Sequence, residues 1–461
     1  MLEKYDVVIV GGGPGGYVAA LRSAKNGKRT ALVEGWHLGG TCLNRGCIPS
    51  KTLLNFVEII EELEKVKNWG IKVENVSISL AEMISRKDQV VSTLRAGINH
   101  LLSKGKINVY NGHGTIHADK TITIQSEAGR QQISGEKIII ATGSQPVIPP
   151  IDGIDSVNYH TTDTIFDMKK LPKSIVIVGG GVIGVELASI FSGLKSEVTI
   201  VELADRLIPT EDEEASKIIL NTLKKKGIKV FTHNQVTSVK ETSHKKTIQI
   251  TSKQGNTEVI SADELLIAVG RKPNLSAVSE LDLKMDGRYI EVNDYLETSK
   301  KDFFAIGDVI GGFQLAHVAS AEGLTAVENL DEKKTKMNNK VIPRCIYTQP
   351  QVASVGMSEA ELQKKNIKYK VNKFPLAGNG KAMTMGATEG FSKVIVDEKY
   401  GEILGVVMVG PYVTEIISQS SAYMFLEGTV DELAQMIQPH PSVSEVLMES
   451  ANALIGKGIH S

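Results

Sequence analysis

The sequence has little cysteine and no long apolar run. Only three cysteines occur among 461 residues, too few for the disulfide framework of a small secreted fold. No apolar stretch approaches the roughly 18 residues that a membrane-spanning helix needs. The start of the chain, residues 1–6, lacks the basic segment and apolar run of a signal peptide. These absences predict a cytoplasmic protein without membrane insertion.

Neither sign of charge is in excess. Lysine and arginine total 52, aspartate and glutamate total 53, and the formal net charge is −1. This balance gives no general attraction for nucleic acid or for anionic membranes. The length exceeds what one hydrophobic core supports, so we expect about three domains.

Glycine is plentiful, and it gathers in two loops that follow strand-like runs. Residues 5–10 are rich in β-branched side chains and lead into Gly11, Gly13 and Gly16, which have the Gly-x-Gly-x-x-Gly spacing. A helical pattern follows, and the next strand-like run, residues 30–34, ends in Glu34. This order of strand, glycine turn, helix and acidic strand end is typical of a dinucleotide-binding βαβ unit.

The same pattern recurs later in the chain. Residues 174–178 lead into Gly179, Gly181 and Gly184, and the strand-like run 197–202 ends in Glu202. Strand-like runs at 137–143 and 264–270 follow their loops at comparable distances, and 303–308 is another such run. The repeat predicts two nucleotide-binding domains, joined by a proline-rich linker from about 145 to 172.

Each acidic strand end predicts a ribose contact. A carboxylate at this position accepts hydrogen bonds from ribose hydroxyls and repels a 2′-phosphate, so Glu202 favours NAD over NADP. The plain structural alternative for Glu34 and Glu202 is a solvated strand end. Arg206, four residues beyond Glu202, is a side chain that could recruit a 2′-phosphate instead.

Two of the cysteines, Cys42 and Cys47, lie close together just after Glu34. The spacing is poor for zinc, which takes four ligands at definite separations. Two neighbouring buried thiols are the structural alternative, but in a cytoplasmic protein such a pair is more often catalytic or metal-binding. Helix-like sequence from Lys51 to Leu54 would stabilise a thiolate at its N-terminal side. The pair also lies just inside the first nucleotide domain, so electrons could pass between a bound flavin and a disulfide.

The segment from Gly39 to Lys51 resembles the redox-disulfide signature of the flavin disulfide reductases, the class I pyridine nucleotide-disulfide oxidoreductases. The wording Cys-Leu-Asn and Cys-Ile-Pro-Ser-Lys is closer to the dihydrolipoamide dehydrogenase branch than to glutathione or trypanothione reductase. Mercuric reductases are also similar in this loop but carry a C-terminal cysteine pair, whereas residues 456–461 contain none. The resemblance covers essentially the whole chain.

The resemblance implies an α/β fold with two Rossmann-like dinucleotide-binding domains plus a C-terminal α+β dimerisation domain. We expect an FAD-binding domain at 1–149, an NAD-binding domain at 150–275, a return to the FAD-binding or central domain at 276–345, and the interface domain of a homodimer at 346–461.

The resemblance also implies the residues that hold the two cofactors, and it implies no metal site. For FAD they are Gly11, Gly13, Gly16, Glu34, Thr41, Lys51, Gly114, Ala141, Thr142, Gly143, Ser144, Asp308, Gln314, Leu315, Ala316 and His317. For NAD they are Gly179, Gly181, Val182, Ile183, Gly184, Glu186, Glu202, Val236 and Gly270, with Glu186 near the nicotinamide.

A histidine near the C-terminus completes the expected catalytic set. His440 and Glu445 flank a proline and resemble the acid–base histidine of the family and the carboxylate that orients it. In the family this pair comes from the partner subunit. The third cysteine, Cys345, has no obvious partner and is expected to be a buried thiol. Arg45 and the Gln438-Pro439 pair depart from the family pattern at the entrance to the disulfide.

The resemblance implies an enzyme that oxidises protein-bound dihydrolipoamide and reduces NAD⁺ through a Cys42–Cys47 disulfide and FAD. Its partners would be lipoyl domains and the acyltransferase core of 2-oxoacid dehydrogenase complexes, or a glycine-cleavage carrier. Two alternatives stay open: a related NAD(P)H-dependent reductase of another disulfide or a metal ion, and a docking flavoprotein whose redox activity is incidental.

Overall fold

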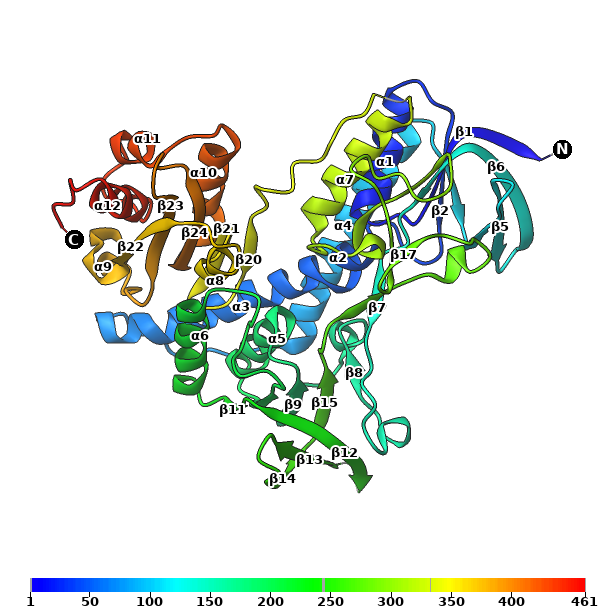
Figure 1. The fold of residues 1–461 in the computed structure, drawn as a ribbon. Coiled ribbons are helices and arrows are strands. Elements are labelled where there is room, and N and C mark those ends of the chain that lie inside the picture. Colours follow the sequence, from blue (N-terminus) through cyan, green and yellow to red (C-terminus); the bar gives the residue numbers. More distant parts are fainter. Residues whose placement is uncertain (1, 243–244, 332, 461) are drawn as a thin grey trace.

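The computed structural model describes residues 2–242, 245–331 and 333–460. The chain forms three sheet-centred units that meet around the long helix α3 (Cys47–Val66), as Figure 1 shows. The apolar face of α3 lies in one core cluster with side chains of both the second and the C-terminal unit. This helix therefore fixes the cysteine at its first position against the rest of the molecule.

The first unit is built on a seven-stranded sheet with the strand order β3-β2-β1-β6-β5-β4, in which β19 pairs with β6. The pairs β1–β2, β1–β6, β2–β3 and β6–β19 are parallel, and β4–β5 and β5–β6 are antiparallel. The strands are β1 (Glu3–Val10), β2 (Thr30–Glu34), β3 (Asn108–Asn111), β4 (His113–Ile116), β5 (Thr121–Ser126), β6 (Gly129–Ile140) and β19 (Phe303–Ala305). The helices are α1 (Pro14–Lys25), α2 (Gly40–Arg45), α4 (Leu80–Lys104) and α7 (Ala316–Asn329).

The second unit has a five-stranded parallel sheet, β11-β10-β9-β15-β8, and an antiparallel sheet, β12-β13-β14. The strands are β8 (His160–Thr161), β9 (Ser174–Val178), β10 (Glu197–Val201), β11 (Lys229–Phe231), β12 (Asn234–Thr242), β13 (Lys245–Ser252), β14 (Thr257–Ala262) and β15 (Glu264–Ile267). The helices are α5 (Val182–Gly193) and α6 (Glu213–Lys225). Two short antiparallel strand pairs form separate two-stranded sheets. They are β7 (Ser144–Pro146) with β16 (Arg271–Pro273), and β17 (Met285–Asp286) with β18 (Tyr289–Ile290).

The C-terminal unit is an antiparallel sheet with helices on it, in the order β20-β21-β24-β23-β22. The strands are β20 (Arg344–Ile346), β21 (Gln351–Gly356), β22 (Tyr369–Pro375), β23 (Phe391–Asp397) and β24 (Ile403–Gly410). The helices are α8 (Glu359–Lys364), α9 (Gly380–Thr384), α10 (Val413–Phe425), α11 (Val430–Gln435) and α12 (Glu445–Leu454). Short 3₁₀ helices elsewhere are η1 (Lys67–Trp69), η2 (Ile154–Ser156), η3 (Ile165–Asp167), η4 (Ser276–Val278), η5 (Gly307–Ile310) and η6 (Leu376–Gly378).

The predicted fold class is confirmed, with the repeated βαβ unit in β1-α1-β2 and again in β9-α5-β10. The linker differs from the expectation, because 145–172 is not wholly irregular: β8 joins the second sheet and β7 pairs with β16. Pro146 ends β7 and is paired with Arg271 in this two-stranded sheet, an edge position that proline tolerates. Among the described residues, none of the helices combines the length and the apolar composition needed to cross a bilayer.

Candidate active site

The first glycine loop joins β1 to α1 and is closed by Glu34. Gly11 has a φ of +108°, and a Cβ on Gly16 would lie 1.8 Å from the Gly11 carbonyl oxygen, so the helix can pack here only on glycine. Glu34 Oε2 accepts the Gly12 N–H at 2.6 Å, and Oε1 accepts the Trp36 N–H at 2.7 Å. Burial raises the pKa of Glu34 although both hydrogen bonds oppose this shift. The carboxylate is thus held at the open edge of the loop.

The second loop repeats this geometry closely. Gly179 has a φ of +109°, and a Cβ on Gly184 would lie 1.9 Å from the Gly179 carbonyl oxygen. Glu202 Oε2 accepts the Gly180 N–H at 2.5 Å, and Oε1 accepts the Ala204 N–H at 2.6 Å. Both acids therefore accept hydrogen bonds from backbone N–H groups at their own loops. A strand end that is merely solvated would not need these bonds.

The middle glycine of each loop tests whether a dinucleotide fits. Gly13 and Gly181 have φ angles of −67° and −71°, which any residue adopts. A Cβ on Gly181 would meet nothing within 4 Å, and one on Gly13 would meet only the Gly40 Cα, at 3.9 Å. Neither backbone strain nor packing within the chain therefore requires glycine at these two positions. The N-termini of α1 and α5 also lack a side-chain cap, so their N–H groups fit a pyrophosphate.

The predicted flavin contacts gather between the first sheet and α7. Asp308, in η5, accepts a hydrogen bond from the Ser144 hydroxyl at 2.5 Å. Gln314 has a left-handed φ of 51°, and its Nε2 is buried without a hydrogen-bond partner among the described residues. A buried donor without an acceptor is costly, and a bound cofactor with polar edges would satisfy it. These residues fit FAD.

A buried acid beside these contacts was missed by the sequence reasoning. Glu322 on α7 accepts the Gly307 N–H at 2.6 Å, next to Asp308. Burial raises the pKa of Glu322 to about 7, and the Asp308 carboxylate adds to the shift. The only signal in the sequence was one acidic residue on the small, apolar face of a helix.

The other predicted cofactor residues lie around the two loops. The Thr142 hydroxyl donates to the Asn274 carbonyl at 2.7 Å, and the His317 Nε2–H donates to the Pro343 carbonyl at 3.0 Å. On the FAD side, Ala141 and Gly143 follow β6, Gly114 lies on β4, Thr41 lies on α2, and Leu315 and Ala316 begin α7. On the NAD side, Val182 and Ile183 begin α5, Val236 is buried on β12, and Gly270 lies between β15 and β16.

The cysteine pair bridges two consecutive helices. Cys42 lies on α2 and Cys47 is the first residue of α3, and both are free thiols in the structure. The Cys42 thiol hydrogen-bonds to Cys47 and lowers the pKa of Cys47 to about 7, against burial and with help from Lys51. The same bond, together with burial, raises the pKa of Cys42. The two thiols therefore differ in acidity, and Cys47 is the more acidic of the pair.

Lys51 is held one turn along α3 by an acid from the second unit. Its Nζ contacts Glu186 Oε2 at 2.7 Å and Oε1 at 3.0 Å, and it lies 4.6 Å from the centre of the Tyr347 ring. Glu186, which is buried, also accepts the Tyr347 N–H at 3.0 Å. This cluster joins all three units beside Cys47. Tyr347 was not predicted, because nothing in its local sequence marks it.

The asymmetry of the thiols gives a testable prediction for the reduced protein. Cys47 should form its thiolate with a midpoint near pH 7, and Cys42→Ala should raise this midpoint toward the ordinary cysteine value because the donor is lost. Cys42→Ser keeps a hydroxyl donor and should retain much of the shift. The measurement is thiolate ultraviolet absorbance against pH, with Cys47→Ser as the blank. Identical midpoints in Cys42→Ala and the unaltered chain would contradict the assigned cause.

His440 and Glu445 are brought together, but not to the cysteines of their own chain. His440 Nδ1 and Glu445 Oε1 are 2.8 Å apart, and Oε2 accepts the Ser442 N–H at 2.8 Å. Despite some burial, these bonds lower the pKa of Glu445. The His440 side chain is 79% exposed. It precedes α12, which lies at one end of the molecule in Figure 1, whereas α2 lies near the centre.

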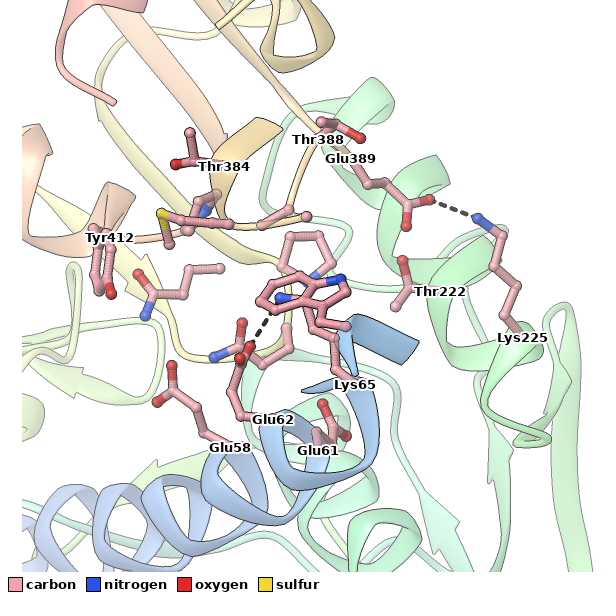
Figure 2. Close-up of a pocket in the computed structure, with 18 residues that line it drawn as sticks. Glu58, Glu61, Glu62, Lys65, Thr222, Lys225, Thr384, Thr388, Glu389 and Tyr412 are labelled. Atoms are coloured by element: carbon pink, nitrogen blue, oxygen red, sulfur yellow. Dashed lines mark hydrogen bonds and ion pairs between the residues drawn. The ribbon is translucent and has the colours of Figure 1, made fainter. Parts of the chain in front are cut away.

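A cavity of about 890 Å³ lies away from this chemistry. Figure 2 shows it between the last turns of α3, α6 and the C-terminal unit, where Lys225 pairs with Glu389 at 3.0 Å. Its first α3 residue, Glu58, is eleven positions beyond Cys47, about 16 Å along the helix.

The third cysteine, Cys345, is half-buried rather than fully buried, and burial raises its pKa to about 11.

Comparison with known proteins adds family-level likeness to this geometry. The family described as pyridine nucleotide-disulphide oxidoreductase matches residues 5–323, and its dimerisation domain matches residues 342–451. A dihydrolipoyl dehydrogenase of Bacillus subtilis strain 168 is 42% identical, with 100% of both chains covered. The flavoprotein disulfide reductase RclA of Escherichia coli, solved as a Cu(II) complex, superposes with a TM-score of 0.88 at 30% identity, covering 98% of this chain and 100% of that one. LpdA of Mycobacterium tuberculosis gives the same TM-score and the same coverage at 26% identity.

Proposed function

Because the chain belongs to the pyridine nucleotide-disulphide oxidoreductase family, we propose that it oxidises protein-bound dihydrolipoyl groups to the cyclic disulfide and reduces NAD⁺. The protein is a flavin disulfide oxidoreductase that uses FAD and NAD(H), and its dimerisation domain supports a homodimer. The observation that carries the proposal is the polarised thiol pair at the start of α3. Full-length likeness to a protein named dihydrolipoyl dehydrogenase supports the choice of substrate.

The proposed reaction begins on the oxidised Cys42–Cys47 disulfide. The partner's His440 takes a proton from one substrate thiol at Nε2, while Glu445 holds the Nδ1–H. The substrate thiolate then bonds to the Cys42 sulfur, and the Cys42–Cys47 bond breaks. Cys47 leaves as a thiolate, in keeping with its lowered pKa.

The second substrate thiol completes the exchange. It displaces Cys42, so that the substrate leaves as a disulfide and both cysteines are reduced. FAD, when bound, supplies the chemistry that takes two electrons from the cysteine pair and delivers them as hydride to NAD⁺. Lys51, fixed by Glu186, holds a positive charge beside the Cys47 thiolate throughout.

The second loop supports NAD rather than NADP as the acceptor. Glu202 directs its carboxylate along the loop, where a 2′-phosphate would be repelled. The Arg206 guanidinium, which could have recruited that phosphate, donates instead to the carbonyls of Pro209 and Glu211 at 3.0 and 3.2 Å. It also lies 4.0 Å from the Glu213 carboxylate.

The direct test is NADH formation from dihydrolipoamide by the purified yellow protein, with NAD⁺ and NADP⁺ in parallel. We expect rapid turnover with NAD⁺ and at least about tenfold less with NADP⁺, because a charge clash of that kind exceeds 1.4 kcal/mol. No turnover with either acceptor, while NADH still bleaches the flavin, would overturn the substrate and leave the redox pair. Other disulfides and Cu(II) would then be assayed, since RclA was solved with that ion.

The partner proteins and the location follow from the same proposal. Lipoyl-bearing domains of 2-oxoacid dehydrogenase complexes, or of a glycine-cleavage carrier, would present the dihydrolipoyl arm. We propose a cytoplasmic location because three cysteines in 461 residues are too few for an export-type disulfide framework. The docking-flavoprotein alternative predicts binding to an acyltransferase core that survives loss of both Cys42 and Cys47.

A further inference from the structure

Arg45 lies between the two redox cysteines but is directed away from their chemistry. Its guanidinium carbon lies 3.8 Å from the centre of the Trp36 ring, a cation–π contact. Its NH1 lies 3.1 Å from Asp163 Oδ2, in the linker between the first two units. The Trp36 backbone N–H donates in turn to Glu34. Arg45 therefore joins the ribose-binding acid of the first loop to the linker.

Asp163 extends this connection toward the flavin end of the same site. Its other oxygen, Oδ1, lies 3.3 Å from Arg271 NH1. Arg271 NH2 donates to the Ser144 carbonyl at 2.9 Å, and its Nε donates to the Ser144 hydroxyl at 2.7 Å. That hydroxyl donates to Asp308. A continuous polar chain thus runs from Trp36 to Asp308, along the whole length of the predicted FAD site.

The charged residues of this hydrogen-bond and ion-pair network are partly buried. The side chains of Arg271, Asp163 and Arg45 are 11%, 19% and 29% exposed, so their ion pairs are screened less than surface pairs. Arg45 Nε is buried without a hydrogen-bond partner among the described residues. A guanidinium donor of this kind beside the adenosine end of the site is suited to an anionic, planar ligand.

We propose that Arg45, fixed by Asp163, is an FAD-retention residue. The Arg45–Trp36 stack closes the adenosine end of the cofactor site, and Asp163 fastens that closure to the linker. The inference rests on FAD as the cofactor and does not depend on dihydrolipoamide as the substrate. The exchange chemistry of Cys42 and Cys47 needs neither side chain, whereas the lifetime of the bound FAD needs both.

The test is the rate at which purified holoenzyme releases FAD after dilution, followed by the emission of free flavin. Arg45→Met and Asp163→Asn should each release FAD about tenfold faster, which corresponds to the loss of one partly buried ion pair. The double variant should release it more slowly than the product of the two single effects predicts, because both variants lose the same Arg45–Asp163 ion pair, although Asp163→Asn also loses the contact with Arg271. Arg45→Lys keeps the ion pair but not the planar stack and should fall between. Arg86→Met on the exposed face of α4 is the matched control.

The apo chains separate retention from folding. Equal thermal unfolding of apo Arg45→Met and the apo parent chain, with faster FAD release, would support the proposal, as would an Arg45→Met protein that folds but purifies without FAD. Parent-like release from both single variants would overturn it. Multiplying effects in the double variant would also overturn it, because Arg45 and Asp163 would then act separately. If Arg45→Met fails to fold, the release rate of the milder Asp163→Asn variant decides.

Discussion

Cys42→Ser and Cys47→Ser should each lower dihydrolipoamide turnover by a factor of at least about a thousand. A hydroxyl cannot form the disulfide that the substrate thiolate attacks, and neither cysteine can replace the other because each occupies a different helix. FAD should stay bound in both variants, since Gly13, Glu34 and Asp308 are untouched. The measurements are steady-state turnover and the flavin absorbance that remains after gel filtration.

A matched control and an internal contrast sharpen this prediction. Cys345→Ser replaces the third thiol, which contacts only the Thr414 carbonyl among its hydrogen-bond acceptors in the described chain, and should keep turnover near that of the unaltered enzyme. Cys42→Ser should leave a thiol that is deprotonated near neutral pH, whereas Cys47→Ser should leave one that is not. Full activity in either active-site variant would refute the proposed exchange.

Much of the site could be predicted because its determinants are local. A glycine loop specifies its own turn, and the acid that serves it ends the next strand, so Glu34 and Glu202 follow from spacing alone. The helix that begins at Cys47 could be expected from the residues after it. The family resemblance added residues that no local pattern marks, such as Gln314 and His440.

The remainder is tertiary. Arg271 and Asp163 are more than 100 residues apart and meet only because β7 pairs with β16 and the linker returns along the first unit. Tyr347, in the C-terminal unit, contacts Lys51 of α3. The sequence indicated that Arg45 departs from the family pattern at the disulfide entrance, whereas the fold turns its guanidinium toward Trp36. Such contacts depend on how units pack, which residue spacing does not encode.

Mixing two inactive variants should restore activity. His440→Ala should slow the dihydrolipoamide half-reaction greatly while leaving flavin reduction by NADH largely intact, because the flavin site lies in another unit. In a mixed dimer of His440→Ala and Cys42→Ser subunits, the His440→Ala subunit has both cysteines and receives an intact His440 from its partner. Random mixing makes half of the dimers mixed and one of two sites functional, so about a quarter of the parent activity should return.

This expectation follows from the placement of the pair rather than from its chemistry. His440 is held by Glu445, yet 79% of its side chain is exposed. Within one chain, α12 lies at one end of the molecule and α2 lies near its centre (Figure 1). A base held ready but facing solvent has a substrate to serve only if another subunit brings its cysteines there. Mixing Cys42→Ser with Cys47→Ser subunits is the control and should restore nothing, because each site keeps one damaged cysteine. No recovery in the first mixture, with mixed dimers verified by two affinity tags, would place each His440 with the cysteines of its own chain.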